Sequence, residues 1–224
     1  MNRADTVKPR DAASLILHRN NTRGLEVLLG KRPSGSSFMP DVYVFPGGGV
    51  EAADARVKPA SPLRRDYTAK LAVANSDARA RTLACTAIRE TFEEVGLMVA
   101  DSANPGSVQH PSWEAFRQAQ QAPLLGALRY IGRAITPTTR PKRFHARFFA
   151  CAVDSVSGLS EQALKGNGEL LDLRWLTIAE TQDLPLRSVT RFMLEQLATQ
   201  QVAGDQWIGS AVYTHKNGKI SITY

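Results

Sequence analysis

Three glutamates within a single helical turn constrain this chain more than any other feature of its sequence. The stretch at residues 89–97 reads Arg-Glu-Thr-Phe-Glu-Glu-Val-Gly-Leu. At about 100° per residue, the spacing i, i+3 and i+4 puts the carboxylates of Glu90, Glu93 and Glu94 on one face of a helix. Like charges crowded in this way repel one another, whereas a divalent cation bound between them is attracted by all three. The pattern therefore predicts either a cation-binding face or an ordinary solvated acidic face.

The sequence around this helix favours the cation-binding alternative. Residues 75–77, Asn-Ser-Asp, supply N-cap chemistry for a helix that reaches Val95, and Gly96 stands where a C-terminal glycine is expected. Upstream, the apolar run at residues 42–45 leads directly into Pro-Gly-Gly-Gly at residues 46–49. A run of glycines allows a sharp turn and lets the backbone approach a ligand closely, although by itself it indicates only a turn.

Length and composition limit the class of protein. A chain of 224 residues that is 43 % hydrophobic is long enough for one domain with a full core. Its apolar runs are too short to cross a membrane and residues 1–8 lack the apolar core of a signal peptide, so we expect a cytoplasmic protein without a membrane partner. Cys85 and Cys151 are expected to be buried, reduced thiols.

The charge balance indicates the kind of partner. A net charge of +7 favours an anionic partner. Because the basic residues are scattered and form no long run, we expect a small phosphorylated molecule rather than a nucleic acid.

Hydrophobic patterning predicts strands and helices that alternate along the chain, as in an α/β layered domain. Strands are expected at residues 11–18, 25–29, 42–45, 130–136, 144–153, 169–176, 211–215 and 220–224. Helices are expected at residues 77–95, 112–121, 178–183 and 188–201, and Ser112 is the expected N-cap of the second. The Asn-Gly of the turn at residues 216–219 is the strongest hairpin signal.

Residues 48–54 and 89–97 together resemble the two halves of the box that characterises the Nudix hydrolases. The usual form of that box is G, five residues, E, seven residues and REUxEExGU. The second half matches closely, with Thr91 at the apolar U position as a mild departure. In the first half, Asp54 stands where the family expects Glu, which keeps the charge on a shorter arm.

The two halves are separated by an insertion. In an uninterrupted box the first glycine and the arginine are about 14 positions apart, whereas Gly48 and Arg89 are 41 positions apart, so about 27 residues are inserted at Asp54. A loop can be lengthened in this way at small entropic cost if its ends return to the same place. An interrupted box of this kind resembles one branch of the family, which includes the peroxisomal coenzyme A diphosphatases of animals. Residues 38–48, 135–137 and 143–149 are similar to the same branch.

The resemblance implies a Nudix α/β/α sandwich with a mixed central sheet. Residues 1–224 are then expected to form one domain, with a helical insertion at residues 55–81 and a C-terminal β-hairpin extension at residues 204–224. The acidic helix and the glycine loop are expected to flank the sheet and to face each other, because the box is a geometric object.

By position, the resemblance also implies the roles of the box residues. Glu90, Glu93 and Glu94, with the carbonyl of Gly47, are the expected ligands of Mg²⁺ or Mn²⁺, since a hard dication prefers several oxygen ligands. Glu90, Glu93 and Arg89 form the expected catalytic group. In it, Glu90 contacts both metal and water, and Arg89 holds the carboxylate of Glu93 in place.

Weaker candidates lie around this group. Supporting roles at the metal site are expected for Gly48, Glu51, Asp54 and Glu169. Phosphate binding is expected from a basic turn made of Arg140, Lys142 and Arg143. A solvated surface explains Glu169 and the basic turn equally well. His110 and His145 lack metal-ligand spacing, and Trp113 and Trp175 are expected in the core rather than stacked on a base.

The resemblance implies metal-dependent hydrolysis of a diphosphate linkage in a nucleoside diphosphate derivative. A coenzyme A or acyl-CoA species is the first choice of substrate, and NDP-sugars, ADP-ribose and dinucleotides are alternatives because the box does not distinguish them. A nucleotide-sensing domain without catalysis is an alternative of another class, but the retention of all three glutamates argues against it. Family habit also implies a homodimer.

Overall fold

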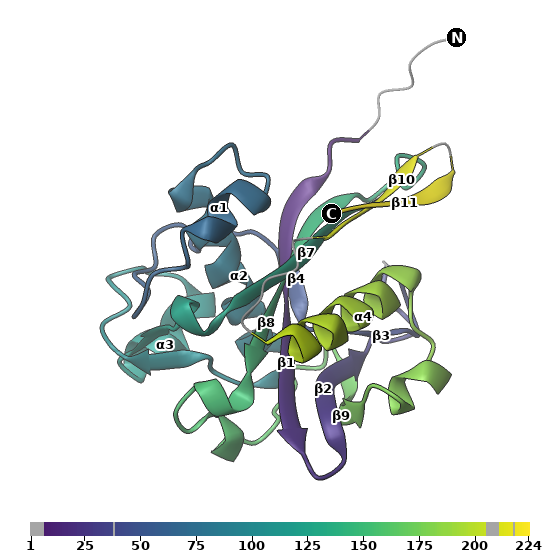
Figure 1. The fold of residues 1–224 in the computed structure, drawn as a ribbon. Helices are drawn as coiled ribbons and strands as arrows, with labels where there is room; N and C mark the ends of the chain where they lie inside the picture. The colour runs from purple at the N-terminus through teal and green to yellow at the C-terminus, as the bar shows by residue number, and fades with distance from the viewer. Residues whose placement is uncertain (1–6, 38, 205–210, 217) are drawn as a thin grey trace.

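A nine-stranded mixed sheet forms the centre of the protein, in a computed structural model that describes residues 7–37, 39–204, 211–216 and 218–224. The strand order is β11-β10-β7-β8-β1-β2-β3, with β4 paired to β1 and β9 paired to β2. The helix α2 covers one face of the sheet and α4 covers the other (Figure 1). This arrangement confirms the expected α/β/α sandwich with a mixed central sheet.

The strands of this sheet are β1 (Arg10–Asn21), β2 (Gly24–Lys31), β3 (Tyr43–Val44), β4 (Gly47–Gly49), β7 (Arg129–Ile135), β8 (Phe144–Ala152), β9 (Leu171–Thr177), β10 (Ala211–Lys216) and β11 (Lys219–Thr223). Two further strands, β5 (Ala100–Ser102) and β6 (Gln121–Pro123), pair with each other. The α-helices are α1 (Asp66–Lys70), α2 (Asp77–Val95), α3 (Glu114–Gln118) and α4 (Ser188–Ala203). Short 3₁₀ helices are η1 (Pro111–Trp113), η2 (Leu125–Ala127), η3 (Val153–Ser155), η4 (Leu159–Glu161) and η5 (Glu180–Asp183).

The central strand β1 supplies side chains to both cores. Because successive side chains of a strand point to opposite faces, Leu15 and Leu17 pack in the core shared with Ile88 of α2. Ile16 packs in the core shared with Leu194 of α4. The parallel pairing of β1 with β8 buries both strands in the middle of the sheet. This position explains the nearly continuous apolar run that the sequence shows in β1.

The helix α2 begins and ends as the sequence predicted. The side chain of Ser76 accepts a hydrogen bond from the backbone N–H of Arg79 at 3.3 Å, which makes it the N-cap. Gly96 adopts the left-handed conformation with φ 79° and donates its N–H to the carbonyl of Phe92. The side opposite the glutamates is buried against the sheet. No helix in the described part of the chain has the length and apolar character that a membrane crossing requires.

The insertion at residues 55–81 is closed at its base. Arg81 Nη2 donates to the carbonyl of Ala55 at 3.3 Å, so the two ends of the inserted segment lie together. The insertion contains the five-residue α1 and the first turn of α2, and the left-handed residues Ala72, Ala74 and Asn75 separate the two helices. The buried Arg147 of β8 donates to the carbonyls of Leu71 and Ala72, at 3.0 and 3.4 Å, and to Asp11 at 2.5 Å. Arg147 therefore ties the insertion to the sheet.

Two expected helices are shorter in the structure. The segment expected as a helix at residues 112–121 consists of η1 and α3, and the predicted N-cap role of Ser112 is wrong because η1 precedes α3. The helix ends early because Gln120 is left-handed and Gln121 enters β6. The segment expected at residues 178–183 forms only η5, because Ile178 still pairs through its backbone with Leu25 of β2.

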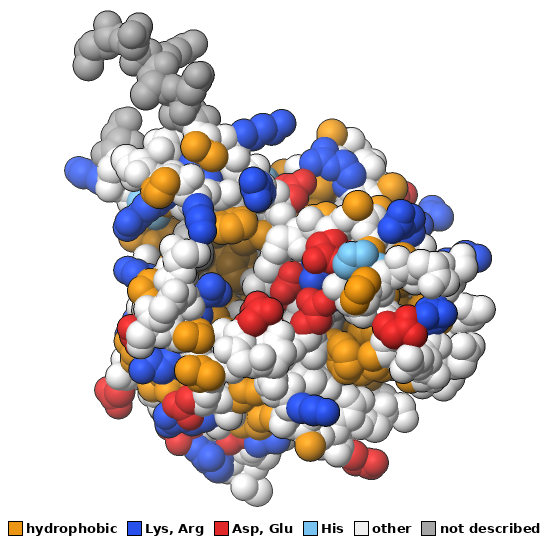
Figure 2. Space-filling model, turned by 180° about the vertical axis from the view of Figure 1, so that it is seen from behind, with side chains coloured by type: hydrophobic (Ala, Val, Ile, Leu, Met, Phe, Trp, Pro, Cys, Tyr) orange, Lys and Arg blue, Asp and Glu red, His pale blue; other side chains and the backbone are white. Residues whose placement is uncertain are grey.

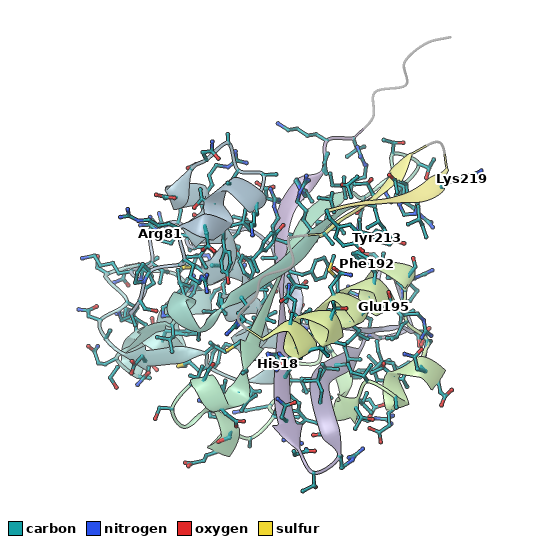
Figure 3. All side chains as sticks on the ribbon, viewed as in Figure 1. His18, Arg81, Phe192, Glu195, Tyr213 and Lys219 are labelled. Atoms are coloured by element: carbon teal, nitrogen blue, oxygen red, sulfur yellow. The ribbon has the colours of Figure 1, made fainter. Side chains whose placement is uncertain are left out.

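The C-terminal hairpin is part of the central sheet. Strand β10 pairs in parallel with β7, from Ala211 opposite Gly132 to Tyr213 opposite Ala134. The ring of Tyr213 faces that of Phe192 on α4, with 5.4 Å between ring centroids (Figure 3). The hairpin therefore extends the sheet and its core. Residues 205–210 of the expected extension and Asn217 of the expected turn lie outside the described residues.

Removing the Arg147 side chain should release the insertion. We expect Arg147→Met to lower the free energy of unfolding by about 3 kcal/mol, because Asp11 loses a buried partner and the carbonyls of Leu71, Ala72 and His145 lose a donor. Urea unfolding measures this loss, and limited proteolysis should cut first within residues 55–81. In the control Arg23→Met, the exposed Glu180 loses an ion pair and the buried Glu26 loses one of its partners but keeps Arg19 and Asn21, so the variant should cost under about 1 kcal/mol. Equal losses of unfolding free energy in both variants would contradict the proposal that Arg147 holds the insertion on the sheet.

Candidate functional site

The glycine loop and the acidic helix meet at one side of the sheet. Strand β4 pairs with β1, Gly47 opposite Ser14, and this pairing places the loop against α2. The backbone N–H of Gly47 donates to Glu94 Oε2 at 2.8 Å. The carboxylate of Glu90 lies directly over Gly48, where an added Cβ would be 2.5 Å from Oε1. The two halves of the box therefore come together despite the insertion, as the sequence required.

Both loop glycines are enclosed. A Cβ on Gly47 would lie 2.6 Å from the carbonyl oxygen of Ala13, and a Cβ on Gly48 would lie within the carboxylate of Glu90. Any side chain at these positions displaces either the neighbouring strand or the glutamate. The glycines are thus required for the close approach of backbone and carboxylate.

Glu90 and Glu94 are poorly solvated. Glu94 is only 4 % exposed. Burial raises the pKa of Glu90 to about 7 and that of Glu94 to about 8, against smaller opposing effects of Arg89 and of the Gly47 N–H. Repulsion from Glu93 and Glu169 adds to the increase for Glu90, and repulsion from Glu90 and Glu169 adds to it for Glu94. The surroundings of Glu90 and Glu94 therefore disfavour the charged form of both carboxylates.

Arg89 connects the acidic residues of α2 to the loop. Its Nη1 donates to Glu90 Oε1 at 2.9 Å and to Glu93 Oε2 at 2.7 Å. Its Nη2 donates to the carbonyl of Gly49 at 2.8 Å. The guanidinium is almost fully buried, so these contacts are shielded from water. The expected contact of Arg89 with Glu93 is present in the structure.

Asp54 faces Arg89 rather than the open side of the site. Its carboxylate is fully buried and accepts from Arg89 Nε at 2.8 Å and from Arg89 Nη2 at 3.2 Å. The other donors are Thr86 Oγ1 at 2.7 Å, Trp113 Nε1 at 3.1 Å and the backbone N–H of Glu51 at 3.0 Å. Sequence reasoning missed Thr86 and the polar contact of Trp113. The spacing of Thr86 and Arg89, i and i+3 on one helix, was a usable signal for Thr86.

Glu51 and Glu169 border the acidic cluster. Glu51 Oε2 lies 3.8 Å from Arg89 Nε and 3.6 Å from His110 Nδ1. Glu169 is exposed and accepts from the side chain of Asn167, and its charge reaches Glu90 and Glu94. Figure 2 shows acidic side chains gathered beside a hollow whose walls include hydrophobic side chains. The cluster is therefore open to a ligand on that side.

The basic turn between β7 and β8 is engaged with other parts of the protein. Lys142 Nζ donates to Ser37 Oγ at 2.8 Å, and Arg143 donates to the carbonyls of Thr136 and Val7. Arg140 has a backbone contact within the turn. Phosphate binding by Arg140, Lys142 and Arg143 stays a prediction.

The chemistry of the acidic cluster fits a hard divalent cation. Among the residues that the structure describes, no three His, Cys, Asp or Glu side chains are already arranged around a common point for a metal ion. The reason is visible in the contacts, because Arg89 holds Glu93 and the Gly47 N–H holds Glu94. Nevertheless, the donors are all oxygens, and burial raises the pKa of two of the carboxylates, whose charged form a bound Mg²⁺ or Mn²⁺ would stabilise.

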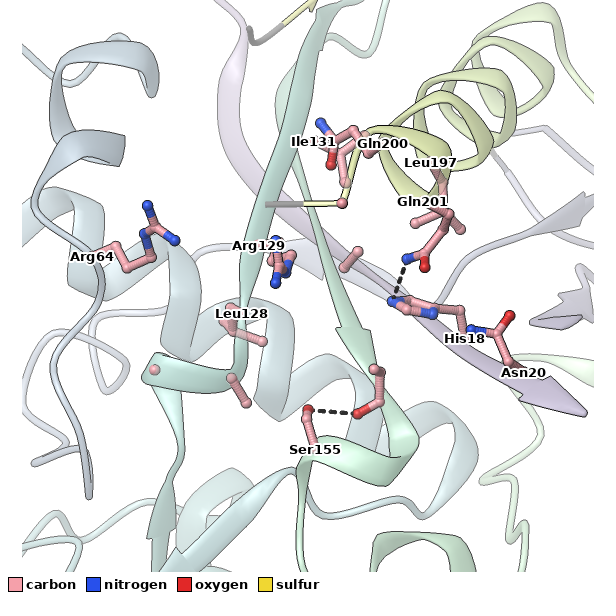
Figure 4. Close-up of a pocket in the computed structure, with 15 residues that line it drawn as sticks. His18, Asn20, Arg64, Leu128, Arg129, Ile131, Ser155, Leu197, Gln200 and Gln201 are labelled. Carbon is pink, nitrogen blue, oxygen red and sulfur yellow. Dashed lines mark hydrogen bonds between the residues drawn. The ribbon is translucent and has the colours of Figure 1, made fainter. Parts of the chain in front are cut away.

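A separate cavity of about 420 Å³ lies on the α4 side of the sheet (Figure 4). His18 and Gln201 approach each other there, and burial together with the charge of Arg129 lowers the pKa of His18 to about 4. The lining residues include arginines and amides but no Asp or Glu. This cavity therefore lacks the ligands of a divalent cation and is distinct from the acidic cluster.

Known proteins with the same architecture are Nudix hydrolases. The crystal structure of a Nudix hydrolase from Alicyclobacillus acidocaldarius is 30 % identical in sequence, with a TM-score of 0.65 over 87 % of this chain and 93 % of that chain. The acyl-coenzyme A diphosphatase NUDT19 of Xenopus laevis is 29 % identical and matches 72 % of this chain and 55 % of that protein. The putative nudix hydrolase 7 of Caenorhabditis elegans is 26 % identical, over 78 % of this chain and 53 % of that protein.

The matches differ in how much of the relative they include. The chain spans about half the length of the curated relatives it matches, whereas it matches nearly all of the crystallised bacterial protein. No family model matches the chain.

The buried glutamates should make the metal-free protein less stable as the pH rises. Their folded pKa values are raised, so between about pH 4.5 and pH 8 the folded state binds more protons than the unfolded state and the free energy of unfolding falls. In EDTA, Glu94→Gln should remove roughly 1–3 kcal/mol of this decrease. Thermal unfolding at pH 5 and pH 8 measures it. The exposed control Glu195→Gln should follow wild type, and an unchanged slope in Glu94→Gln would contradict the assignment.

Proposed function

The chain belongs to the Nudix hydrolase family, and on that premise we propose that it hydrolyses the diphosphate linkage of a nucleotide derivative with the help of a divalent metal ion. The observation that carries the proposal is the contact of Gly47 and Gly48 with Glu94 and Glu90, which assembles the box across an insertion. A helix whose acidic face served only solubility would have no need for this contact.

The metal ligands in this proposal are the oxygen donors of the box. Glu90, Glu93, Glu94 and the carbonyl of Gly47 would hold Mg²⁺ or Mn²⁺. The bound cation would neutralise the diphosphate and lower the pKa of a bound water. Arg89 keeps Glu90 and Glu93 in a fixed orientation through its Nη1.

Further proposed roles concern proton transfer and the entry of the substrate. Glu90 is the residue proposed to accept a proton from the attacking water, since its carboxylate lies over the glycine loop. Glu169 and Glu51 border the cluster and are proposed to support it. The open side of the cluster admits the substrate (Figure 2).

We propose coenzyme A or an acyl-CoA species as the substrate. The support is the similarity to the Xenopus laevis acyl-coenzyme A diphosphatase and the hollow with hydrophobic walls beside the acidic cluster. Arg140, Lys142 and Arg143 are proposed to bind phosphate groups of the substrate. NDP-sugars, ADP-ribose and dinucleotides are the alternatives within the same reaction class.

Hydrolysis should be detectable with purified protein and a panel of CoA, NADH, ADP-ribose and NDP-sugars in Mg²⁺ or Mn²⁺. We expect Glu93→Gln to lower kcat about 100-fold, because a metal ligand loses its charge while the fold is retained. Mass spectrometry of the products and thermal unfolding of both proteins give the two readouts. Wild-type protein that binds nucleotides but hydrolyses none would exclude the enzyme, and full activity in Glu93→Gln would place the metal elsewhere.

Gly48→Ala should inactivate the protein without unfolding it. The three atoms nearest to the added Cβ all belong to the end of the flexible Glu90 side chain, so we expect the carboxylate to move away and kcat to fall at least about tenfold. Gly35→Ala is the matched control, because a Cβ there meets open space. Comparable kcat values in the two variants would show that the position of Glu90 over the loop is unimportant.

A further inference from the structure

The short helix η1 contacts the site although it begins well after the end of α2. Trp113 Nε1 donates to Asp54 Oδ1 at 3.1 Å. Ser112 Oγ donates to Glu51 Oε2 at 3.3 Å, and His110 Nδ1 is 3.6 Å from the same oxygen. Three neighbouring side chains therefore approach the two carboxylates of the loop that follows the glycines.

Of these contacts, the hydrogen bond to Asp54 affects the orientation of Arg89. The carboxylate of Asp54 is fully buried, so every hydrogen bond it accepts comes from the protein. Arg89 contacts both of its oxygens, while Trp113 and Thr86 each contact one oxygen from other directions. Together these donors fix the plane of the carboxylate, and that plane fixes the guanidinium of Arg89.

Arg89 transmits this orientation to the acidic helix. The same guanidinium that lies against Asp54 uses Nη1 to reach Glu90 and Glu93. A rotation of Asp54 would therefore change the direction in which Arg89 presents Nη1. The indole of Trp113 is itself rigid, because it is fully buried and packs on Phe116 with 4.9 Å between ring centroids.

We propose that Trp113 is a positioning residue of the active site, which acts through Asp54 and Arg89 on Glu90 and Glu93; this proposal rests on the proposed hydrolase function. A tryptophan that served only the core would be replaced by phenylalanine with a loss of buried area alone. Here the N–H ends on a buried carboxylate, so its removal leaves an acceptor with one donor fewer.

Trp113→Phe tests the proposal, since it keeps an aromatic ring in the core and removes the N–H. Thr86→Val is the second variant, because it keeps the shape of the side chain and removes the hydroxyl, which lies 2.7 Å from Asp54 Oδ2 and 2.9 Å from the carbonyl oxygen of Thr82. Trp175→Phe is the control: this ring stacks under the guanidinium of Arg19, 4.4 Å from its Cζ atom, on a strand away from Asp54. Thermal unfolding should show that all three variants fold.

Two readouts distinguish positioning from packing. In Trp113→Phe and Thr86→Val we expect kcat to fall about tenfold, with KM changed less than about threefold, because Arg89 no longer holds the two glutamates in place. The second readout is the rate at which the Arg89 Nε–H exchanges with solvent, measured by ¹⁵N NMR, with the signal assigned from its absence in Arg89→Lys. In Trp113→Phe and Thr86→Val this exchange should become about tenfold faster. Trp175→Phe should leave both quantities at the wild-type values.

The outcomes separate this proposal from the proposed function. Unchanged kcat and unchanged Arg89 exchange in Trp113→Phe and Thr86→Val would overturn the positioning role. Equal effects in Trp175→Phe would overturn it as well, since the loss would then be general. If wild-type protein hydrolyses no substrate, the proposed function fails, and the Arg89 exchange rate alone then decides whether Trp113 positions Arg89. If Trp113→Phe does not fold, Thr86→Val still tests whether a donor lost at Asp54 affects Arg89, and an unchanged Arg89 exchange rate there would overturn the positioning role.

Discussion

The buried guanidinium of Arg89 is the interaction on which the site depends. It contacts Asp54 at the start of the insertion, Gly49 in the glycine loop, and Glu90 and Glu93 on α2. The network of carboxylates around the guanidinium offsets the cost of its desolvation, because the pKa of Arg89 is raised by Asp54, Glu90 and Glu93 although burial lowers it. Its value lies in geometry, because a planar group with several donors allows one relative position of loop and helix.

Burial and crowding of the carboxylates make their charged forms unfavourable when no cation is bound. Glu90 and Glu94 have raised pKa values because they are buried near each other with only partial compensation from Arg89 and the Gly47 N–H. A helix with a purely structural role gains nothing from such an arrangement, whereas a bound cation would stabilise it. The same carboxylates are thus expected to weaken the metal-free fold and form the proposed ligand set.

The insertion leaves the site intact because hydrogen bonds fix its two ends to each other and its middle to the sheet. Arg81 joins the base of the insertion to Ala55, and Arg147 holds Leu71 and Ala72 on the sheet. A long loop costs little when its ends are fixed by the rest of the fold. The chain can therefore leave at Asp54 and return to α2 without moving the glycine loop away from the glutamates.

The sequence by itself determined the acidic face, the caps of α2 and the glycine loop, because helical period and backbone requirements are local properties of Glu90–Glu94, Ser76 and Gly96. Resemblance to the Nudix box added the sandwich. Only the tertiary structure decided that Asp54 turns toward Arg89, that Trp113 donates to Asp54 and that the hairpin joins β7. It also shortened the helix expected at residues 112–121, since pairing of Gln121 with β5 outweighs local propensity. These features depend on where distant segments meet, which no local pattern encodes.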